Sequence, residues 1–197
     1  MNASEGMATR IAGVLGQAGI AISVVWGFAE ATLWFIVPDV AVGAVALLLP
    51  SRWWRVATAT IAASLLGGLV LFTAALVDGD ASRTAILALP GIDHEMASDV
   101  RDELAADGGS ALVRAPLSGV PYKVYTVEMA DQSWGVASYL AWSLPSRTLR
   151  ILPVAAIAAL VGWWLAGFIR RRTGAVLAAY VAGWVVLYVF YFRSVGI

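Results

Sequence analysis

The chain has 197 residues, of which 60% are hydrophobic and 13% are charged, and its mean hydropathy is +0.80. Because soluble domains are about 45–50% apolar and about 25% charged, this composition excludes a soluble domain and predicts an all-α integral membrane protein, a polytopic helical bundle. The balance of 13 basic and 13 acidic residues gives no indication of nucleic-acid binding, and the lack of cysteine with only one histidine excludes disulfides, thiolate sites and a multi-histidine metal centre.

The N-terminal part of the chain predicts a short tail followed by one helix. Residues 1–10 are mixed in charge, and residues 11–27 are apolar and rich in glycine. At about 1.5 Å per residue, this apolar run is a marginal membrane span. It lacks a convincing small-residue cleavage site, so we expect a retained helix rather than a signal peptide.

Residues 28–50 form an apolar stretch that carries two acidic residues around a proline. A carboxylate at the centre of a bilayer costs about 2.5–3.5 kcal/mol, so Glu30 and Asp39 are expected to face a bundle interior, a partner charge or water. Pro38 removes a backbone donor and disfavours helical geometry at Val37, which predicts a break there. Two alternatives stay open: a re-entrant hairpin packed among other helices, or a kinked spanning helix with Glu30 near one interface.

Residues 56–77 form the clearest spanning helix of the chain. The motif SRWWR at 51–55 precedes it and pairs arginine with tryptophan, as expected at a membrane interface. Small residues along this helix predict close packing against another backbone: Ala63, Ser64, Gly67 and Gly68.

Residues 78–110 differ sharply in composition from the rest of the chain. Eight of the 13 acidic residues lie here: Asp78, Asp80, Asp93, Glu95, Asp99, Asp102, Glu103 and Asp107. This predicts an exposed acidic segment. Within it, Met96, Val100 and Leu104 recur every four residues and predict an amphipathic helix near 93–106, with His94 on the surface.

A second broken segment is predicted at residues 111–131. Pro116 and Pro121 interrupt its apolar pattern, and Arg114 and Lys123 place basic groups near the prolines. We therefore expect a second hairpin, built like the first but with basic charge near its proline. Each half of the core then consists of a broken segment followed by a spanning helix, a pattern that favours a pseudo-symmetric transporter with a site where the broken segments meet.

The C-terminal part predicts three more helices. The first covers residues 132–144 and ends at Leu144–Pro145, the second covers 151–169 and is closed by Arg170–Arg172, and the last spans 174–192. This gives roughly four spanning helices, with a core over residues 11–172 and a C-terminal transmembrane helix over 173–197. The arginine triplet favours a cytoplasmic end, although alternating ends would place Arg52 and Arg55 outside, against the positive-inside rule.

Two motifs together resemble one membrane protein family. The first is Glu30-Ala31-Thr32 with Val37-Pro38-Asp39, and the second is the run Gly-Val-Pro-Tyr-Lys-Val-Tyr-Thr at 119–126, with Ser143, Ser146, Arg147 and Arg150 downstream. Over residues 25–170, these motifs resemble the DedA family, also called VTT or SNARE-associated membrane proteins, and especially its YqaA-like branch. The Pro-Tyr-Lys run with its downstream arginine pair is the more specific of the two motifs.

The resemblance implies two re-entrant hairpins that enter from opposite faces, and a role in moving lipid head groups across the bilayer. Bacterial members are associated with recycling polyprenyl-phosphate carriers such as undecaprenyl phosphate, coupled to ion gradients, and eukaryotic relatives behave as phospholipid scramblases. The family's acidic pair would fall on Glu30 and Asp39, and its arginine pair on Arg147 and Arg150. The resemblance also implies a bacterial or archaeal cytoplasmic membrane.

The chain departs from the family pattern at several positions. Asp39 stands where glutamate is usual, and Gly119 stands where the branch commonly has a proline, which loosens the hairpin tip. Glu128-Met129-Ala130 replaces a small Ala-Gly turn and is expected to add a carboxylate near Lys123. The chain therefore resembles a divergent member of the family.

The charged residues indicate how such a protein would work. Arginine offers a planar fork that matches phosphate oxygens, so we expect the phosphate to be bound by Arg147, Arg150, Lys123 and Arg114. The carboxylates are expected to neutralise these cations in the empty site and to couple binding to protons or sodium: Glu30, Asp39 and Glu128. The breaks at Pro38, Pro121 and Gly119 would bring both sets of charges together. We expect no catalytic residue, no metal and no cofactor.

Two other function classes stay open on sequence grounds. The same charges could form a structural ion-pair network in a membrane scaffold or assembly protein that transports nothing. An enzyme acting on lipid phosphates is disfavoured, because it would need a histidine or cysteine nucleophile or a dense set of carboxylates, and His94 lies in the acidic segment. The expected partners are membrane lipids; a homo-oligomer stays open.

Overall fold

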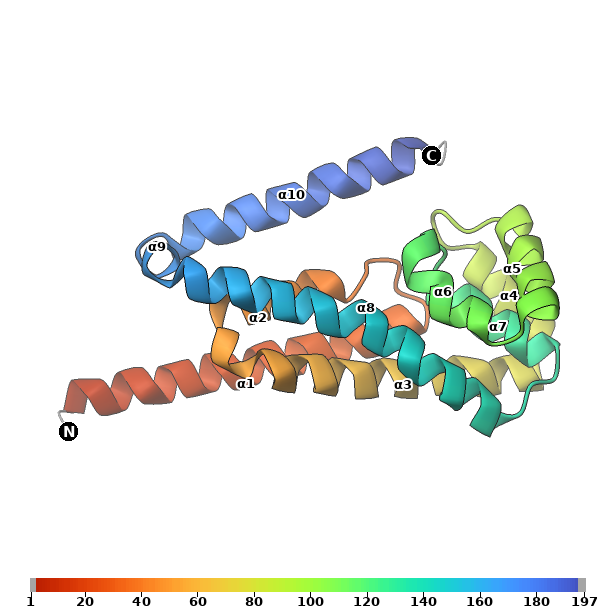
Figure 1. The fold of residues 1–197 in the computed structure, drawn as a ribbon, viewed down its shortest axis with the longest axis horizontal. Helices are drawn as coiled ribbons and strands as arrows, with labels where there is room; N and C mark the ends of the chain where they lie inside the picture. The colour runs from red at the N-terminus through yellow and green to blue at the C-terminus, as the bar shows by residue number, and fades with distance from the viewer. Residues whose placement is uncertain (1–2, 195–197) are drawn as a thin grey trace.

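In the computed structural model of the protein, the backbone is described for residues 3–194 and side chains for residues 16–193. The regular elements in this range are all helical, which confirms the predicted helical class. In chain order they are α1 (Ala3–Ala31), α2 (Asp39–Leu48), the 3-10 turn η1 (Pro50–Arg52), α3 (Trp53–Val77), α4 (Gly79–Leu87), α5 (His94–Asp107), α6 (Ser110–Ser118), α7 (Tyr122–Asp131), α8 (Val136–Trp164), α9 (Ala166–Arg171) and α10 (Thr173–Ser194) (Figure 1).

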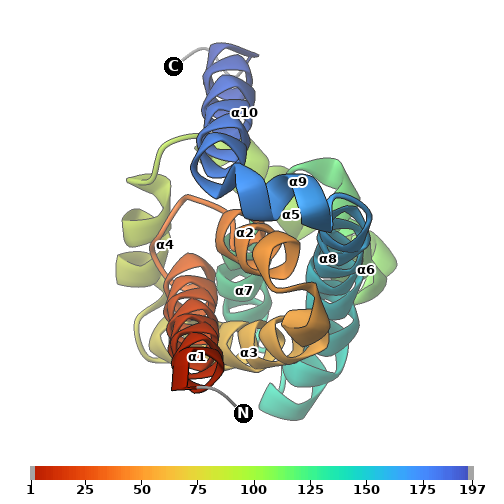
Figure 2. The same cartoon turned by 90° about the vertical axis from the view of Figure 1, so that its left-hand side faces the viewer.

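Three long helices frame the molecule. Helices α1 and α3 run in the same direction, and α8 runs back along them (Figure 1). Seen along the long axis, α2 lies between α1, α3 and α8, with α7 behind it (Figure 2). Helices α4 to α6, residues 79–118, gather at one end of this frame and are called the cap below (Figure 1).

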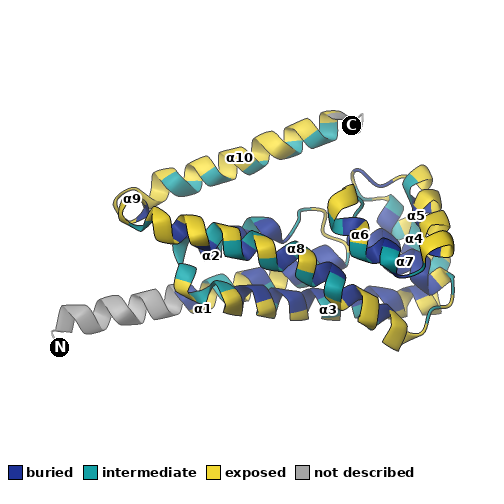
Figure 3. Cartoon of the chain, in the orientation of Figure 1, coloured by how far each residue is buried: buried dark blue, intermediate teal, exposed yellow. Residues whose placement is uncertain are grey.

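Three segments of the described chain are long and apolar enough to cross a membrane: Pro50–Val77, Val136–Trp164 and Thr173–Arg193. Large apolar side chains such as Leu66, Ile157 and Leu160 are more than half exposed on the outer faces of these helices, and Figure 3 shows exposed residues along most of α10. Lipid tails solvate such surfaces, so these outward faces support the predicted membrane protein.

Helix α3 packs through its small residues, as predicted. A Cβ atom on Gly67 would lie 2.5 Å from the carbonyl oxygen of Phe28 in α1, and one on Gly68 would lie 2.3 Å from the phenol oxygen of Tyr139 in α8. Ala63 and Ser64 are buried on the same helix. The absence of side chains at the two glycines therefore lets α1 and α8 approach α3 closely.

The first broken segment reverses direction and is not a kinked helix. Helix α1 ends at Ala31, residues 32–38 form a loop, and α2 runs back from Asp39 (Figure 1). Pro38 stands at the N-cap of α2, at the predicted break. The first arm is not a separate half-helix, because residues 28–31 are the last turn of the 29-residue α1. That helix begins at Ala3, so it also includes most of the stretch predicted as a tail.

The second broken segment has its break at residues 119–121, between α6 and α7. Gly119 ends α6 with a φ of +82°, a left-handed conformation that glycine adopts without strain. Pro121 precedes α7 in extended geometry. The expected interruption at Pro116 is wrong, because this proline lies inside α6, which tolerates the loss of one backbone hydrogen bond.

The acidic segment contains two helices, of which the sequence predicted only α5. The apolar face of α5 is buried at Ala97, Val100 and Leu104, close to the predicted pattern. Helix α4 was missed. The sequence signal for its start is Asp78, a residue type that favours helix N-caps. In the structure, the Asp78 carboxylate caps the helix by accepting a hydrogen bond of 2.9 Å from the backbone N–H of Ala81.

Helix α8 is continuous where the sequence predicted two helices. It runs from Val136 to Trp164 through Pro145 and Pro153, so the predicted end at Leu144 and the separate helix over 151–169 are wrong. Membrane helices accept proline when neighbouring groups satisfy the freed carbonyls, and α8 packs against α2 and α3 over this stretch. The predicted final helix is confirmed as α10.

The arginine-rich segments gather at the end opposite the cap. The turn η1, the start of α3 and helix α9 all lie there (Figure 1). These elements carry Arg52, Arg55, Arg170 and Arg171, and Arg172 follows α9 directly. The expectation that alternation would separate the two arginine groups is therefore wrong, because α3 leads to the cap and α8 leads back.

Candidate functional site

A cavity of about 210 Å³ lies where the tips of the two broken segments meet. Phe35 and Val37 line it from the loop between α1 and α2, and residues 119–121 line it from the loop between α6 and α7. The middle of α8 adds Ser146, Arg147 and Arg150. Its volume would hold several water molecules, each with a share of about 30 Å³, or a small polar group.

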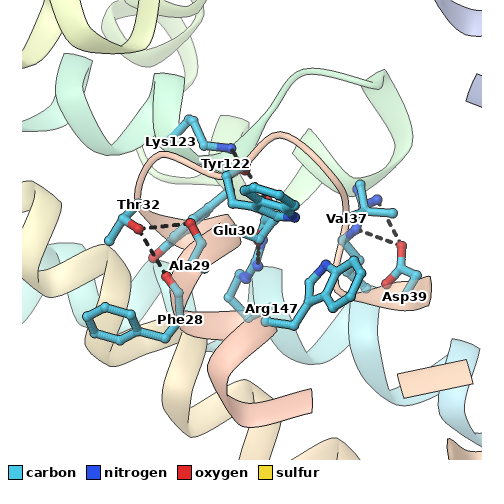
Figure 4. Close-up of polar contacts among 12 residues, drawn as sticks. Phe28, Ala29, Glu30, Thr32, Val37, Asp39, Tyr122, Lys123 and Arg147 are labelled. Atoms are coloured by element: carbon cyan, nitrogen blue, oxygen red, sulfur yellow. Dashed lines mark hydrogen bonds and ion pairs between the residues drawn. The ribbon is translucent and has the colours of Figure 1, made fainter. Parts of the chain in front are cut away.

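Three of the predicted charges form one buried cluster on this cavity. The carboxylate of Glu30, at the end of α1, accepts a hydrogen bond from the Arg147 guanidinium of α8. The Lys123 ammonium, in the first turn of α7, lies 3.8 Å from the other oxygen of Glu30 and donates a 3.1 Å hydrogen bond to the carbonyl of Trp34. Figure 4 shows these side chains converging from three helices. Each residue is at most 5% exposed.

A second ion pair lies beside this cluster. The Arg150 guanidinium donates two hydrogen bonds, of 3.1 and 2.9 Å, to one oxygen of Asp39 in the first turn of α2. Arg150 lines the cavity and is 24% exposed, whereas Asp39 is buried behind it. Arg147 and Arg150 share a helical face, as their spacing predicted. The first helical turns of α2 and α7 and the last turn of α1 therefore bring their charges to one stretch of α8.

Two buried polar atoms of these ion pairs have no hydrogen-bond partner: the Nε donor of Arg147 and one carboxylate oxygen of Asp39. Buried polar groups in proteins are nearly always paired, with protein or with an ordered ligand or water. These two atoms are therefore exceptions within an otherwise paired set of charges beside the cavity.

The sequence did not identify Tyr122 as part of the site. The Arg147 guanidinium lies over its ring, 4.5 Å from the centroid, in a cation–π contact. The phenol oxygens of Tyr122 and Tyr139 are 2.6 Å apart, so Tyr139 holds the ring in place from α8. The aromatic ring beside Lys123 in the Pro-Tyr-Lys run was the available signal.

Helix α10 forms one wall of the cavity, although the sequence predicted a separate C-terminal helix. Its aromatic residues recur every four positions and face the bundle: Tyr180, Trp184, Tyr188 and Phe192. The phenol of Tyr188 accepts a 2.8 Å hydrogen bond from the backbone N–H of Val37. The phenol of Tyr180 lies 3.1 Å from the carbonyl oxygens of Asp39 and Val40. The four-residue spacing was visible in the sequence.

Two predicted site residues lie elsewhere. Arg114 is exposed on α6 and pairs with Asp107, so it lies apart from the other residues predicted to bind phosphate. Glu128 is not near Lys123, because five residues along a helix turn it to the other side of α7. There it is buried against Arg83 and Arg101 of α4 and α5, at 2.8 and 3.1 Å. Glu128 therefore fixes the cap to α7.

The cap also buries one phenol. Tyr125, on the side of α7 that faces α5, donates a 2.7 Å hydrogen bond to the Glu103 carboxylate. Burial and this carboxylate together raise the pKa of Tyr125, so the phenol stays protonated well into the alkaline range. His94 is exposed at the start of α5, as predicted. Within residues 16–193, no group of three or more histidine and acidic side chains is placed to hold a metal ion.

The site is a cavity lined by three cations, by the Glu30 carboxylate and by an aromatic wall on α10, with Asp39 buried behind Arg150. Comparisons of the chain with protein-family models, with curated proteins and with solved structures give no match.

Proposed function

We propose that the protein is a flippase- or scramblase-like transporter of the kind that the resemblance to the DedA family implies, and that it moves a phosphate-bearing lipid, such as polyprenyl phosphate or a phospholipid, across the bilayer. The observation that carries this proposal is the buried basic cavity between the two broken segments. Charged groups at membrane depth are costly and mark transport paths in many membrane proteins.

The cavity has the chemistry that a phosphate needs. The guanidinium groups of Arg147 and Arg150, two residues that line the cavity, offer forked donors. The first turn of α7 lines the cavity as well, so the positive end of this helix dipole adds to the attraction for an anion. The aromatic wall on α10 would contact the apolar part of a lipid while the head group is bound.

The arrangement of the breaks also supports two re-entrant hairpins. Helix α2 returns toward the arginine-rich end, while α6 belongs to the cap and α7 lies beside it at the opposite end (Figure 1). In a membrane, non-helical backbone such as residues 32–38 and 119–121 is tolerated only where protein or a water-filled cavity covers it. Both loops line the same cavity, through Phe35 and Val37 and through residues 119–121.

The test is lipid movement in proteoliposomes with labelled polyprenyl phosphate and labelled phospholipid. We expect rapid movement of at least one lipid by the wild-type protein and loss of it in Arg147→Ala. Arg114→Ala is the matched control and should behave like the wild type, because Arg114 lies on the cap surface. If Arg147→Ala does not fold, Arg147→Met replaces the donor with an apolar side chain of similar length, while Lys123 remains beside Glu30 to compensate its charge.

A scaffold function is the second candidate. It is favoured by one observation, that every charged side chain of the site already has a partner within the protein: Glu30, Asp39, Lys123, Arg147 and Arg150. Such pairs would simply fasten α1, α2 and α7 to α8. Correctly folded protein that moves neither lipid would select this alternative.

A further inference from the structure

The buried charges of the site do not cancel. Lys123, Arg147 and Arg150 carry three positive charges, whereas Glu30 and Asp39 carry two negative ones, which leaves an excess of one positive charge. Four of these five residues are at most 5% exposed, so water does little to screen them. A buried site of this kind favours a ligand that brings its net charge to zero.

The two carboxylates differ in what an incoming anion would do to them. All three cations line the cavity, and so does Glu30, whereas Asp39 does not. An anion that binds Arg147 and Lys123 would therefore draw both cations away from Glu30, while Asp39 would keep its two hydrogen bonds from Arg150. Glu30 is thus the carboxylate that loses its partners.

The groups around Glu30 come from four helices. They are Lys123 and Tyr122 of α7, Arg147 and Arg150 of α8, Asp39 of α2 and Tyr188 of α10. Only the three basic side chains among them favour the ionised carboxylate, and they are the ones that an anion would engage. A buried carboxylate without a cationic partner takes up a proton.

From this balance we infer that the site distinguishes head groups by charge. With both carboxylates ionised it takes a head group with one negative charge, a phosphodiester. A phosphomonoester with two negative charges binds together with one proton from solution, which adds to the Glu30 carboxylate to give the neutral acid. In both cases the occupied site is electrically neutral. The inference rests on the proposed binding of a phosphate-bearing head group.

The experiment measures proton uptake on binding by titration calorimetry of the full-length protein in detergent, in two buffers that differ in ionisation enthalpy. Three anions serve as probes. Dimethyl phosphate carries one negative charge, and methyl phosphate carries two at a pH well above its second pKa of about 6. Sulfate also carries two negative charges, and it is not protonated in this range. We expect no proton uptake with dimethyl phosphate and about one proton per site with methyl phosphate and sulfate. The Kd of sulfate should then rise about tenfold per pH unit, while that of dimethyl phosphate stays constant.

Two variants assign the proton. In Glu30→Gln we expect sulfate to bind without proton uptake, whereas Glu95→Gln, a matched change on the exposed face of α5, should keep the uptake of one proton. Binding of sulfate or methyl phosphate to the wild type without proton uptake would overturn this inference and leave the proposed function standing. Failure of all three probes to bind would instead count against the proposed function.

Discussion

Buried hydroxyl groups in the described chain differ in whether their own helix satisfies them. Ser23 and Thr60 each donate to the carbonyl oxygen four residues earlier, at 3.0 and 2.8 Å. Ser64 is equally buried, yet its hydroxyl has no hydrogen-bond partner. An unpaired buried hydroxyl costs about 1–3 kcal/mol, so Ser64 reduces the stability of the protein.

The first prediction concerns this hydroxyl. Ser64→Ala should raise the free energy of unfolding by about 1 kcal/mol, because it removes a polar group that gains nothing in the folded state. Thermal unfolding in detergent measures the effect. Ser23→Ala is the matched control and should not stabilise, since it removes a hydroxyl that is bonded to Gly19. A fall in stability for Ser64→Ala would mean that its hydroxyl is satisfied after all.

The second prediction concerns the pair of Arg147 and Glu30. Arg147→Met removes the closer of the two cations that compensate Glu30 and leaves Lys123 at 3.8 Å, so this variant should destabilise by less than the cost of a fully unpaired buried charge, about 3–5 kcal/mol. The double variant with Glu30→Gln should lose less than the sum of the two single variants, because Glu30→Gln alone leaves both Arg147 and Lys123 uncompensated and the double variant leaves only Lys123. Denaturant unfolding of the wild type, both single variants and the double variant measures the coupling. Additive losses would show that the two charges do not interact.

Of the charged residues that the sequence predicted for the site, five could be placed there from sequence and two could not. Glu30, Asp39, Lys123, Arg147 and Arg150 meet because each lies next to a break or on one face of α8, and both features are local. Arg114 and Glu128 were misplaced because nearness in sequence was taken as nearness in space. On α7, Lys123 and Glu128 are five residues apart and point to opposite sides, so helical phase separates them.

Among the helices, α7 makes ion pairs on two sides, through a basic residue on one side and through acidic residues on the other. Its first turn presents Lys123 to the cavity, and its later turns present Glu128 and Asp131 to the cap. Arg83 of α4 and Arg101 of α5 each contact both of these acidic residues. The cap is thus fastened to the same helix that contributes a cation to the site.

The third prediction tests this connection. Glu128→Ala should destabilise the docking of the cap by about 3 kcal/mol, because the carboxylate is buried and faces two arginines. Hydrogen exchange of α4 and α5 should become faster. Asp107→Asn is the control. It breaks an exposed ion pair with Arg114, so the loss should stay below about 1 kcal/mol. Equal effects of both variants would show that burial does not distinguish the two pairs.

The elements themselves were predictable to different degrees. Breaks at Pro38 and at residues 119–121 followed from backbone chemistry, which acts locally. Pro116, Pro145 and Pro153 carry the same chemistry but interrupt nothing, because packing against neighbouring helices compensates for a missing hydrogen bond. Whether a proline ends a helix therefore depends on contacts that a single segment does not reveal. The role of α10 was missed for the same reason.

Over the whole molecule, charge is divided between the two ends. The end with η1 and α9 carries the arginines at positions 52, 55 and 170–172, and the opposite end carries the acidic cap (Figure 1). Sequence reasoning misjudged this because the number of crossings was wrong: α8 is one helix that returns to the arginine-rich end. With the correct number of crossings, the positive-inside rule gives the same membrane orientation for all of these arginines.

The fourth prediction is this orientation. The arginine-rich end should face the cytoplasm and the cap should face the opposite side. The chain has no cysteine, so single substitutions give unambiguous labels. In intact cells, a membrane-impermeant maleimide should label Ser98→Cys in the cap, and it should label Ser51→Cys in η1 only after permeabilisation. Both positions are exposed. The reverse labelling pattern would invert the orientation.

The contacts of α10 with the first broken segment have a consequence for how the sequence can vary over evolution. Tyr180 and Tyr188 bond to backbone atoms of Val37, Asp39 and Val40, not to their side chains. Any residue supplies a carbonyl oxygen, and any residue except proline supplies the N–H at position 37. Mutations at Val37 to residues other than proline, and mutations at Val40, therefore leave these hydrogen-bonding groups in place. Tyr180 and Tyr188 can stay fixed while positions 37 and 40 vary, so sequence similarity at those positions would fade before the architecture does.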